Sequence, residues 1–502
     1  MSKKVSFNKE ALDPIIKGLD IVSDAVIGTM GPKGRNAYLM SEIPQITNDG
    51  FTVAKNIFLE NKEEDAGAYI IRNLTGQQND VVGDGTTTVA CLAKNIIHEC
   101  LKRPENPMEI KESLKEASDK ILKLLSAKSI KVKKEDVEKV AMISAENTEI
   151  SKIITEIVNK LGEKAVINVQ DSRTFATEYE IVDGYEANVG FMSPHFVNDK
   201  SGKAIYNDIP VFVSQKKISN IQDISPLFNL FKENNITSCV IVCEDIDDSM
   251  LGLLVRNKAM GVFSSLVIRA TGPLLKDIEG EVGATAVSSE TGINFADVKI
   301  EHLGKAKKIV CDANKTLFLG DGISAKNYAN ILEQQAENET NMFIREKLEE
   351  RINKLRGGIA ILKIGAPTDL ERDYLRLKAE DAVKAVQAAL EEGVVEGGGM
   401  ALWRIADEMN PKTIGEEILK KALKSPLQTI IRNAGKDYTE ITKKLMENVG
   451  YNAKTDEFVN MLETGIVDPT KVERCALENA VSAVGTAITS FCLLTEYEKP
   501  SK

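Results

Sequence analysis

The sequence predicts a multidomain α and α/β protein, in which a mainly α-helical domain, discontinuous in sequence, brackets an inserted α/β domain. Apolar residues with helical spacing dominate roughly the first 125 and the last hundred residues. Short β-prone runs alternate with helical segments in the middle of the chain. The 502 residues are enough for about three domains.

The elements are predicted in chain order from local patterns. A helix is expected over residues 8–28, where apolar side chains recur every three or four positions before Gly28. Two short strands follow, and helices then continue to about residue 125. The other expected elements are strands at 37–40, 44–49, 165–169, 209–213, 238–243, 265–269 and 359–364, helices at 225–235 and 248–260, a charged helix pair at 325–355, and a helix at 370–391 that Gly393 stops.

Composition narrows the classes of function. The net charge of −11 and the low aromatic content of 5% argue against a nucleic-acid partner, and no apolar run reaches the length of a membrane helix. The N-terminus lacks the apolar core of a signal peptide. The seven cysteines form no CxxC pair, which is typical of reduced, mostly buried thiols. A cytoplasmic protein is therefore predicted.

The segment Gly-Asp-Gly-Thr-Thr-Thr at 83–88 is the most informative motif. It precedes a helix-like run, and helix N-termini bind phosphates through free N–H groups and the positive end of the dipole. Asp84 would repel a bare phosphate but suits a Mg²⁺ ion held between carboxylate and phosphate oxygens. The alternative is an ordinary N-cap, with Asp or Thr closing a helix that does no chemistry.

Four other segments fit a nucleotide site, each with a plainer alternative. Residues 29–36 and 397–399 are rich in glycine, which permits close approach to a ligand, but they could be a loop and a flexible joint. Residues 47–50 place Asp49 in good turn sequence. Glu380 and Asp381 point about 100° apart on a helix, so one could enter a cleft and orient a water near a γ-phosphate; the alternative is an exposed acid.

The order of the segments resembles that of a GroEL-like group I chaperonin, from about residue 5 to about residue 497. Eight segments match in order and approximate spacing: TMGPKGRN (29–36), TNDG (47–50), GDGTTT (83–88), KISNI (217–221), AEDAV (379–383), EEGVVEGGG (391–399), GYNA (450–453) and VDPTKV (467–472). Coincidence does not produce eight ordered matches over this length, so the chain is identified as a member of that family.

The resemblance implies three domains and an assembly. The equatorial ATP-binding domain would comprise 1–127 and 392–502, the intermediate hinge domain 128–182 and 367–391, and the apical substrate-binding domain 183–366. The family forms heptameric rings, single or double, that capture non-native polypeptides and work with a GroES-like lid. The chain is accordingly expected to be an ATPase whose Mg-ATP-driven domain movement promotes folding.

The resemblance also assigns site residues. Asp84 is the expected Mg²⁺ ligand, K⁺ is left open as a second cation, and Asp49 and Asp381 are the expected catalytic carboxylates. The other expected nucleotide-binding residues are Thr29, Met30, Gly31, Pro32, Asn48, Gly85, Thr86, Thr87, Thr88, Gly398, Asn452, Ala453, Lys454 and Asp468. The expected groove for polypeptide is formed by Phe191, Phe196, Phe228, Leu251 and Val255, whereas Leu227, Phe231 and Leu254 are assigned to the core.

Some positions depart from the family pattern. Asn48 replaces a lysine that helps to hold phosphates, and Val189 replaces an arginine whose acidic partner corresponds to Asp369. Ser225 and Arg256 replace apolar groove positions. Asn48 and the more polar groove favour the alternative function, a chaperonin-fold holdase or scaffold with weak ATP turnover, and Val189 removes one ion pair between subunits that the family commonly forms.

Overall fold

The computed structural model describes residues 3–40, 45–133, 136–163, 165–172, 174–199 and 202–496. Residues 1–2 and 497–502 of the predicted equatorial domain, and residue 44 of a predicted strand, lie outside the described residues. The chain divides into two compact units. Unit 1 comprises residues 1–159, 171–177 and 364–502, and unit 2 comprises 160–170 and 178–363. The predicted limits of three domains stay a prediction.

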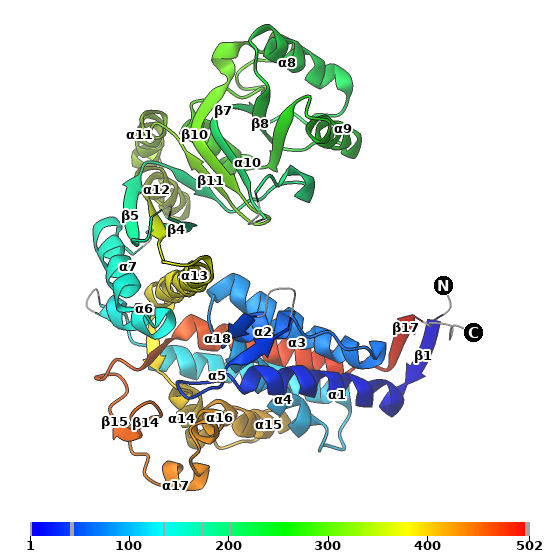
Figure 1. Cartoon of the computed structure of the whole chain (residues 1–502), viewed down its shortest axis with the longest axis vertical. Coiled ribbons are helices and arrows are strands. Elements are labelled where there is room, and N and C mark those ends of the chain that lie inside the picture. Colours follow the sequence, from blue (N-terminus) through cyan, green and yellow to red (C-terminus); the bar gives the residue numbers. More distant parts are fainter. Residues whose placement is uncertain are drawn as a thin grey trace. The chain divides into compact units, whose positions relative to one another are not determined.

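Unit 1 is mainly helical, as expected for the two ends of the chain (Figure 1). Its helices are α1 (Asn8–Ile27), α2 (Gly50–Lys55), α3 (Lys62–Val82), α4 (Thr86–Cys100), α5 (Pro107–Lys128), α6 (Val137–Ala145), α7 (Thr148–Leu161, which ends in unit 2), α13 (Asp369–Glu392), α14 (Met400–Glu408), α15 (Ile414–Ala422), α16 (Ser425–Asn433), α17 (Tyr438–Thr442) and α18 (Thr470–Ile488). Its two-stranded ladders are antiparallel: β1 (Lys3–Phe7) with β17 (Cys492–Glu496), β2 (Ala37–Leu39) with β3 (Gln45–Thr47), β13 (Val394–Glu396) with β16 (Val467–Pro469), and β14 (Gly450–Asn452) with β15 (Glu457–Val459).

Helix α4 lies at the centre of the unit 1 core. It packs against α1, α3, α15, α16 and α18, and its apolar residues from Val89 to Ile97 are fully buried. A helix that is apolar on most faces is stable only inside such a bundle. The same packing fixes the direction in which the N-terminus of α4 points, and this is the end that carries the Gly-Asp-Gly-Thr-Thr-Thr segment.

Unit 2 is an α/β structure around a six-stranded sheet with strand order β6-β11-β10-β7-β8-β9. Its strands are β6 (Tyr185–Ala187), β7 (Ala204–Ser214), β8 (Ser238–Cys243), β9 (Ser264–Arg269), β10 (Gly304–Cys311) and β11 (Thr316–Leu319). A three-stranded sheet has the order β4-β12-β5, from β4 (Val166–Asp171), β12 (Ile359–Ile364) and β5 (Glu178–Val182). The helices are α8 (Ile221–Glu233), α9 (Asp248–Ala259), α10 (Gly272–Val282), α11 (Ile323–Asn338) and α12 (Met342–Arg356).

The sheet of unit 2 is mixed, which the sequence pattern did not indicate. Strands β7, β8 and β9 are parallel and have α8 and α9 between them, as the alternation predicted. Strands β10 and β11, by contrast, form an antiparallel hairpin that also pairs with β7 and β6. The β10 sequence GKAKKIVC begins with charged residues, so its apolar pattern is too short to stand out.

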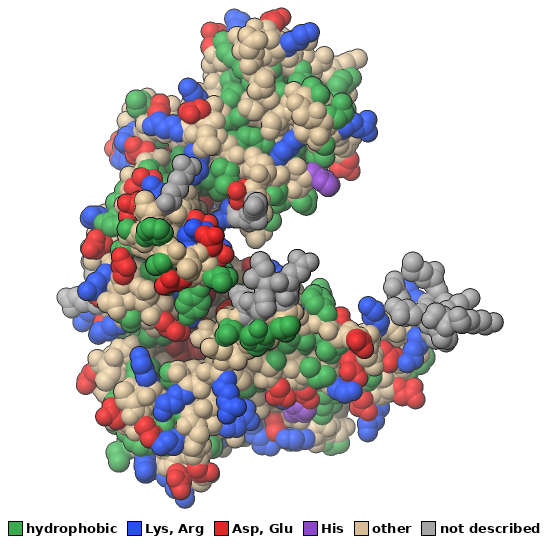
Figure 2. Space-filling model, in the orientation of Figure 1, with side chains coloured by type: hydrophobic (Ala, Val, Ile, Leu, Met, Phe, Trp, Pro, Cys, Tyr) green, Lys and Arg blue, Asp and Glu red, His purple; other side chains and the backbone are tan. Residues whose placement is uncertain are grey.

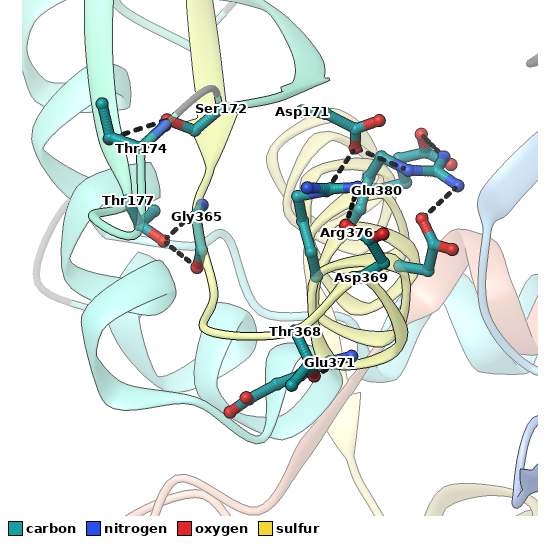
Figure 3. Close-up of polar contacts among 12 residues, drawn as sticks. Asp171, Ser172, Thr174, Thr177, Gly365, Thr368, Asp369, Glu371, Arg376 and Glu380 are labelled. Atoms are coloured by element: carbon teal, nitrogen blue, oxygen red, sulfur yellow. Dashed lines mark hydrogen bonds and ion pairs between the residues drawn. The ribbon is translucent and has the colours of Figure 1, made fainter.

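The segments of unit 1 at 171–177 and 364–369 are tied to α13 and to each other (Figure 3). Asp171 lies 3.2 Å from Nε of Arg376, which also pairs with Glu380 at 3.0 Å. The Thr177 hydroxyl and the backbone of Gly365 hydrogen bond at 3.3 to 3.4 Å. Thr368 caps the start of α13 by accepting from the Glu371 amide. The orientation of α13 within unit 1 therefore depends on this polar network.

Among the described residues, none of the helices combines the length and the apolar character needed to cross a bilayer. All seven cysteines are free, and only Cys492 is exposed, which agrees with the prediction of mostly buried thiols.

Candidate nucleotide site

The start of α4 is built by two glycines in the left-handed region. Gly83 ends α3 with φ +68°, and Gly85 precedes α4 with φ +74°. Side chains rarely adopt these values, so the reversal from α3 to α4 depends on glycine at both places. No side-chain oxygen caps α4, and the plain N-cap alternative is therefore wrong for this segment. The first N–H groups of α4 are left for another acceptor.

Asp84 lies between these glycines and is held by its neighbours. Its Oδ1 accepts from the Gly85 amide at 2.6 Å. Its backbone carbonyl accepts from Nε2 of Gln78 at 3.1 Å, and the same nitrogen donates to the carbonyl of Val472 at 3.0 Å. Gln78 is fully buried and also accepts from Asn479. Gln78 therefore joins α3, the Asp84 turn and the start of α18.

Sequence reasoning missed Gln78. The signal was present: Gln78 lies on the buried face of α3 with Leu74, Thr75 and Val82. A glutamine among apolar positions is a buried amide that needs partners, but the pattern alone does not identify them.

Asp49 caps helix α2, and its negative charge also acts on Asp84 and Asp381. Its carboxylate accepts from the Thr52 amide at 2.7 Å, so it caps α2, a role that the prediction of a turn at 47–50 did not include. The following residue, Gly50, is buried between α2 and α4: a Cβ there would lie 2.5 Å from Oγ1 of Thr87 and 2.9 Å from Oγ1 of Thr86. This close approach brings the Asn48–Asp49 turn to the hydroxyls at the start of α4.

Asp381, a residue of α13, approaches the same turn between α3 and α4. The side chain of Lys384, one turn further along, covers Gly83, and its Nζ donates to the carbonyl of Asn79 at 2.8 Å. Glu380 points instead to Arg376. Of the two adjacent acids, Asp381 is therefore the one that faces the turn between α3 and α4.

The three aspartates influence one another electrostatically. Burial, and then the negative charges of Asp49 and Asp84, raise the pKa of Asp381 to about 8, although Lys384 and Lys378 act in the opposite direction. Burial also raises the pKa of Asp84, with smaller contributions from Asp49 and Glu146. Like charges in a desolvated site disfavour ionisation. The cluster is therefore short of positive charge.

The positive charge of Lys378 also acts on this cluster. Lys378 on α13 is largely buried and donates to Glu146 at 3.0 Å, and its charge lowers the pKa of Asp84. Among the described residues no group of three or more His, Cys, Asp or Glu side chains is arranged to hold a metal ion. The donor set nevertheless fits Mg²⁺, because Mg²⁺ is usually held by one or two carboxylates together with substrate phosphates and water.

The loop after α1 is rigidly held. The Thr29 hydroxyl donates to the carbonyl of Val26 at 2.8 Å, and both Thr29 and Met30 are buried. Gly31 adopts φ +82°, and Pro32 is exposed. Nδ2 of Asn433, a residue that sequence reasoning did not select, donates to the carbonyls of Ile27 and Met30 at 3.0 Å each.

The residues expected around the base lie in two neighbouring turns of unit 1. Asn452 accepts from the amide of Lys454 at 3.0 Å in the β14–β15 turn, where Ala453 is buried and Lys454 is exposed. Ala453 shares an apolar cluster with Met30, which links this turn to the loop after α1. Thus the cluster brings two of the predicted segments together.

Asp468 and Gly398 are also adjacent. β13 pairs with β16 so that Val395 lies opposite Asp468, and a Cβ at Gly397, the residue before Gly398, would lie 3.0 Å from Oδ1 of Asp468. Burial and the charge of Asp84 raise the pKa of Asp468. The Asp468 turn is therefore within electrostatic range of the phosphate-side acid.

The residues predicted to form the polypeptide groove lie in unit 2, and one of the five assignments is wrong. Phe191, Phe228, Leu251 and Val255 are half-buried at the edge of the core. Phe196, however, is 0% exposed, so its assignment to the groove is wrong. Its ring lies inside the unit 2 core under Lys258, whose Nζ donates to the Phe196 carbonyl.

The three residues assigned to the core beside this surface are buried, and two exposed apolar residues near it were not predicted from the sequence. Leu227, Phe231 and Leu254 are buried, as predicted. Met260 and Val262, just after α9, are 65% and 62% exposed and were not predicted. Figure 2 shows apolar side chains at the surface in the part of unit 2 that contains α8 and α9. Ser225 and Arg256 are exposed on the same helices.

Comparison with known proteins agrees with this architecture. A model of the TCP-1/cpn60 chaperonin family matches residues 22–199 and 215–490. Among solved structures, the chain is similar to the chaperonin gp146 from the bacteriophage EL 2 (Pseudomonas aeruginosa), crystallised in the presence of ATP-BeFx. In one crystal form the TM-score is 0.75 at 18% identity, covering 98% of this chain and 99% of gp146. In the other form it is 0.69 at 19% identity, with the same coverage. Because the family model covers most of the sequence, the chain belongs to the TCP-1/cpn60 chaperonin family.

Proposed function

We propose that this chain is an ATP-hydrolysing chaperonin that captures non-native polypeptides and promotes their folding. One observation carries the ATPase part: Asp49, Asp84 and Asp381, far apart in sequence, converge on an uncapped helix N-terminus, where the charges of Asp49 and Asp84 raise the pKa of Asp381. Phosphate binding needs the free N–H groups, and phosphoryl transfer to water needs a carboxylate that orients the water.

Each residue has a role in this proposal. The start of α4, Gly85 to Thr88, receives the phosphates, and Asp84 holds Mg²⁺ beside them. Bound Mg²⁺ would supply the positive charge that this acidic cluster lacks. Asp381 and Asp49 orient and deprotonate the attacking water, and the charge of Lys378 supports Asp84. The Asn452–Lys454 and Gly398–Asp468 turns hold the nucleoside. K⁺ stays open as a second cation.

Client capture is proposed for the α8–α9 surface. Its support is the set of partly exposed apolar residues Phe191, Phe228, Leu251 and Val255, which Met260 and Val262 extend. An exposed apolar surface binds unfolded chains with little sequence preference. The assembly would be a heptameric homo-oligomeric ring, single or double, that cooperates with a GroES-like lid in the cytoplasm.

The test of turnover is phosphate release from ATP with Mg²⁺ present. Asp381→Asn should lower the rate by about 10²- to 10⁴-fold, which is the usual contribution of a general base. Asp373→Asn, an exposed acid on the same helix, is the matched control and should behave as wild type. Equal background rates in wild type and Asp381→Asn would refute the ATPase proposal.

A second candidate is a chaperonin-fold holdase or scaffold with weak turnover. The exposed polar residues Ser225 and Arg256 on the client surface favour it, as does Asn48 beside the catalytic Asp49. Aggregation of a denatured client would then be suppressed equally with and without ATP. Electron micrographs of the protein with and without ATP would reveal whether rings form and whether they change shape.

A further inference from the structure

A basic cavity lies at the C-terminal end of α4, in the region where α15 packs against that helix (Figure 1). Its volume is about 550 Å³, within the range of pockets that bind small molecules. Five of the eight described residues that line it are cationic, namely Lys102, Arg103, Lys420, Lys421 and Lys424. The whole chain has a net charge of −11, so the cavity gathers positive charge in an acidic protein.

A half-buried acid positions two of the lysines. Glu99, in the last turn of α4, accepts from Nζ of Lys102 at 2.5 Å on Oε1 and from Nζ of Lys421 at 2.9 Å on Oε2. Its side chain is only 13% exposed. Burial acts to raise the pKa of Glu99, but the two hydrogen bonds outweigh burial and lower this pKa. Glu99 therefore stays ionised and holds two ammonium groups together, each with donors left for a further acceptor.

Two other cations of the cavity are only weakly neutralised. Arg103 pairs with Glu417 at 2.7 Å, and Lys424 pairs with Asp407 at 3.4 Å. The side chains of these two acids are 47% and 59% exposed. Ion pairs in contact with water contribute little stability, so both cations can still bind an anion from solution.

Lys420 is the cation with no acidic partner. Its Nζ donates to the carbonyl of Met409 at 2.6 Å, and among the described residues it forms no ion pair with a carboxylate. Because Glu99 is shared by two lysines, the five cations exceed the three acids paired with them by two charges. A concave site lined by one sign of charge raises the local concentration of the opposite ion. The cavity therefore favours an anion.

The lining residues also narrow the chemistry of that anion. Lysine ammonium groups and the arginine guanidinium are common phosphate ligands in proteins. Each additional cation attracts a further negative charge, so the site favours a ligand with several phosphate groups over a single phosphate. None of the described lining residues is aromatic, and a base would have no ring on which to stack. A compact polyphosphate fits this lining better than a nucleotide.

We propose that this cavity binds a compact anion with several phosphate groups, of the class of short inorganic polyphosphates. The lysines at the end of α15 and the Lys102–Arg103 pair after α4 contact its phosphate oxygens, and Glu99 positions two of these lysines. The site is separate from the nucleotide site at the start of α4, because the 15 residues of that helix span about 20 Å. The inference does not rest on the proposed function.

Titration calorimetry of the full chain with tripolyphosphate tests the proposal. EDTA is present because, without Mg²⁺, the acidic cluster at the start of α4 repels a bare polyphosphate. Wild type should bind one tripolyphosphate per chain, with a Kd that rises as NaCl is added. Inorganic phosphate should bind at least about tenfold more weakly, since it carries fewer charges. Equal affinity for the two anions would overturn the assignment to a polyphosphate.

Variants locate the binding in this cavity. Lys420→Gln with Lys421→Gln should raise the Kd by at least about tenfold, because two contacts to a charged ligand are lost. Lys420→Arg with Lys421→Arg keeps both charges and should stay within about threefold of wild type. The matched control is Lys305→Gln with Lys307→Gln, two exposed lysines on β10 of unit 2, which should leave the Kd unchanged.

Three results with these variants would overturn the site. They are an unchanged Kd in the glutamine variant of α15, an equal loss in the β10 control, and a loss in the arginine variant as large as that in the glutamine variant. Thermal unfolding of each variant, compared with wild type, identifies any change in Kd that comes from loss of folding.

Trp403, the single tryptophan of the chain, reports on the place of binding. Nζ of Lys424 lies 5.9 Å from the centroid of its ring, so an anion bound beside Lys424 should change the fluorescence of Trp403. Tripolyphosphate that binds without changing this emission would place its site elsewhere. A glutamate-rich peptide that displaces tripolyphosphate at a lower concentration would show that the cavity binds an acidic polypeptide, and the proposal would be wrong.

Discussion

Gly50 and Thr87 approach so closely that a Cβ at position 50 would lie 2.5 Å from Oγ1 of Thr87. This contact joins the cap of α2, where Asp49 lies, to the first turn of α4, where the predicted phosphate-binding hydroxyls lie. Two segments of the proposed nucleotide site, separate in sequence, can therefore lie this close only because residue 50 has no side chain.

Gly50→Ala should push α2 away from α4. We expect a loss of about 1–3 kcal/mol in the free energy of unfolding, typical of overpacking, and weaker Mg-ATP binding because Asp49 moves. Urea unfolding and nucleotide titration measure both. Gly76→Ala is the control: its Cβ would meet only Phe51 at 3.6 Å, and alanine favours a helix interior. Equal behaviour of the two variants would contradict the role of the close contact.

Gln78→Leu removes the amide that bridges Asp84 and Val472. Two carbonyls in a buried place would lose their donor, which costs about 1–3 kcal/mol for an unsatisfied buried group. The Asp84 turn should loosen, so the Kd for Mg-ATP should rise as well. Chemical denaturation and nucleotide binding check the prediction against Gln77→Leu, which alters the exposed neighbour on the same helix. A wild-type Kd in Gln78→Leu would show that the bridge serves only stability.

Asp381 should make the nucleotide-free and metal-free protein less stable as pH rises. Its pKa is raised from 3.8 to about 8 by burial and by Asp49 and Asp84, so between these values the folded state binds more protons than the unfolded state. The free energy of unfolding then falls with increasing pH across that window.

Asp381→Asn removes this dependence. By about pH 8.5 the variant should melt about 2–4 °C higher than wild type, with the difference shrinking toward pH 4. Thermal unfolding without metal or nucleotide measures it, and Asp373→Asn should follow wild type at every pH. A constant difference between Asp381→Asn and wild type across pH would rule out titration of this carboxyl.

The α8–α9 surface should lose client capture when charge is introduced. Leu251→Glu with Val255→Glu should reduce suppression of client aggregation severalfold, because buried apolar contact with the client provides about 25 cal/mol for each Å². Light scattering of a denatured client checks it. Ile331→Glu, at an exposed apolar position on α11 of the same unit, is the control. Normal capture by the double variant would place client binding elsewhere.

Phe196→Ala should act on stability, because the ring is in the core of unit 2. We expect a loss of about 3–5 kcal/mol, typical of phenylalanine-to-alanine changes in a core. Phe343→Ala, which truncates a ring that is mostly exposed on α12, should cost far less. Urea unfolding compares the two variants. A urea midpoint equal to that of wild type for Phe196→Ala would contradict the placement of this ring in the core.

Features that depend on neighbours in sequence were predictable. The glycines around Asp84 indicated a tight turn before a helix, and the runs at 238–243 and 359–364 are strands with those same bounds. Ordered motifs along the chain indicated the chaperonin family, which is confirmed. These features are local, or depend only on order, so the amino-acid sequence contains them directly.

Tertiary packing decided the rest. Only the folding of α13 onto α3 brings Asp381 toward Asp49 and Asp84 and raises its pKa. The burial of Phe196 depends on how its segment packs into the core, and a half-polar sequence pattern does not specify that. Thus the sequence determined which acids and glycines are available. The three-dimensional packing determined which acids share one desolvated site, because burial and proximity between distant residues arise only when the helices pack.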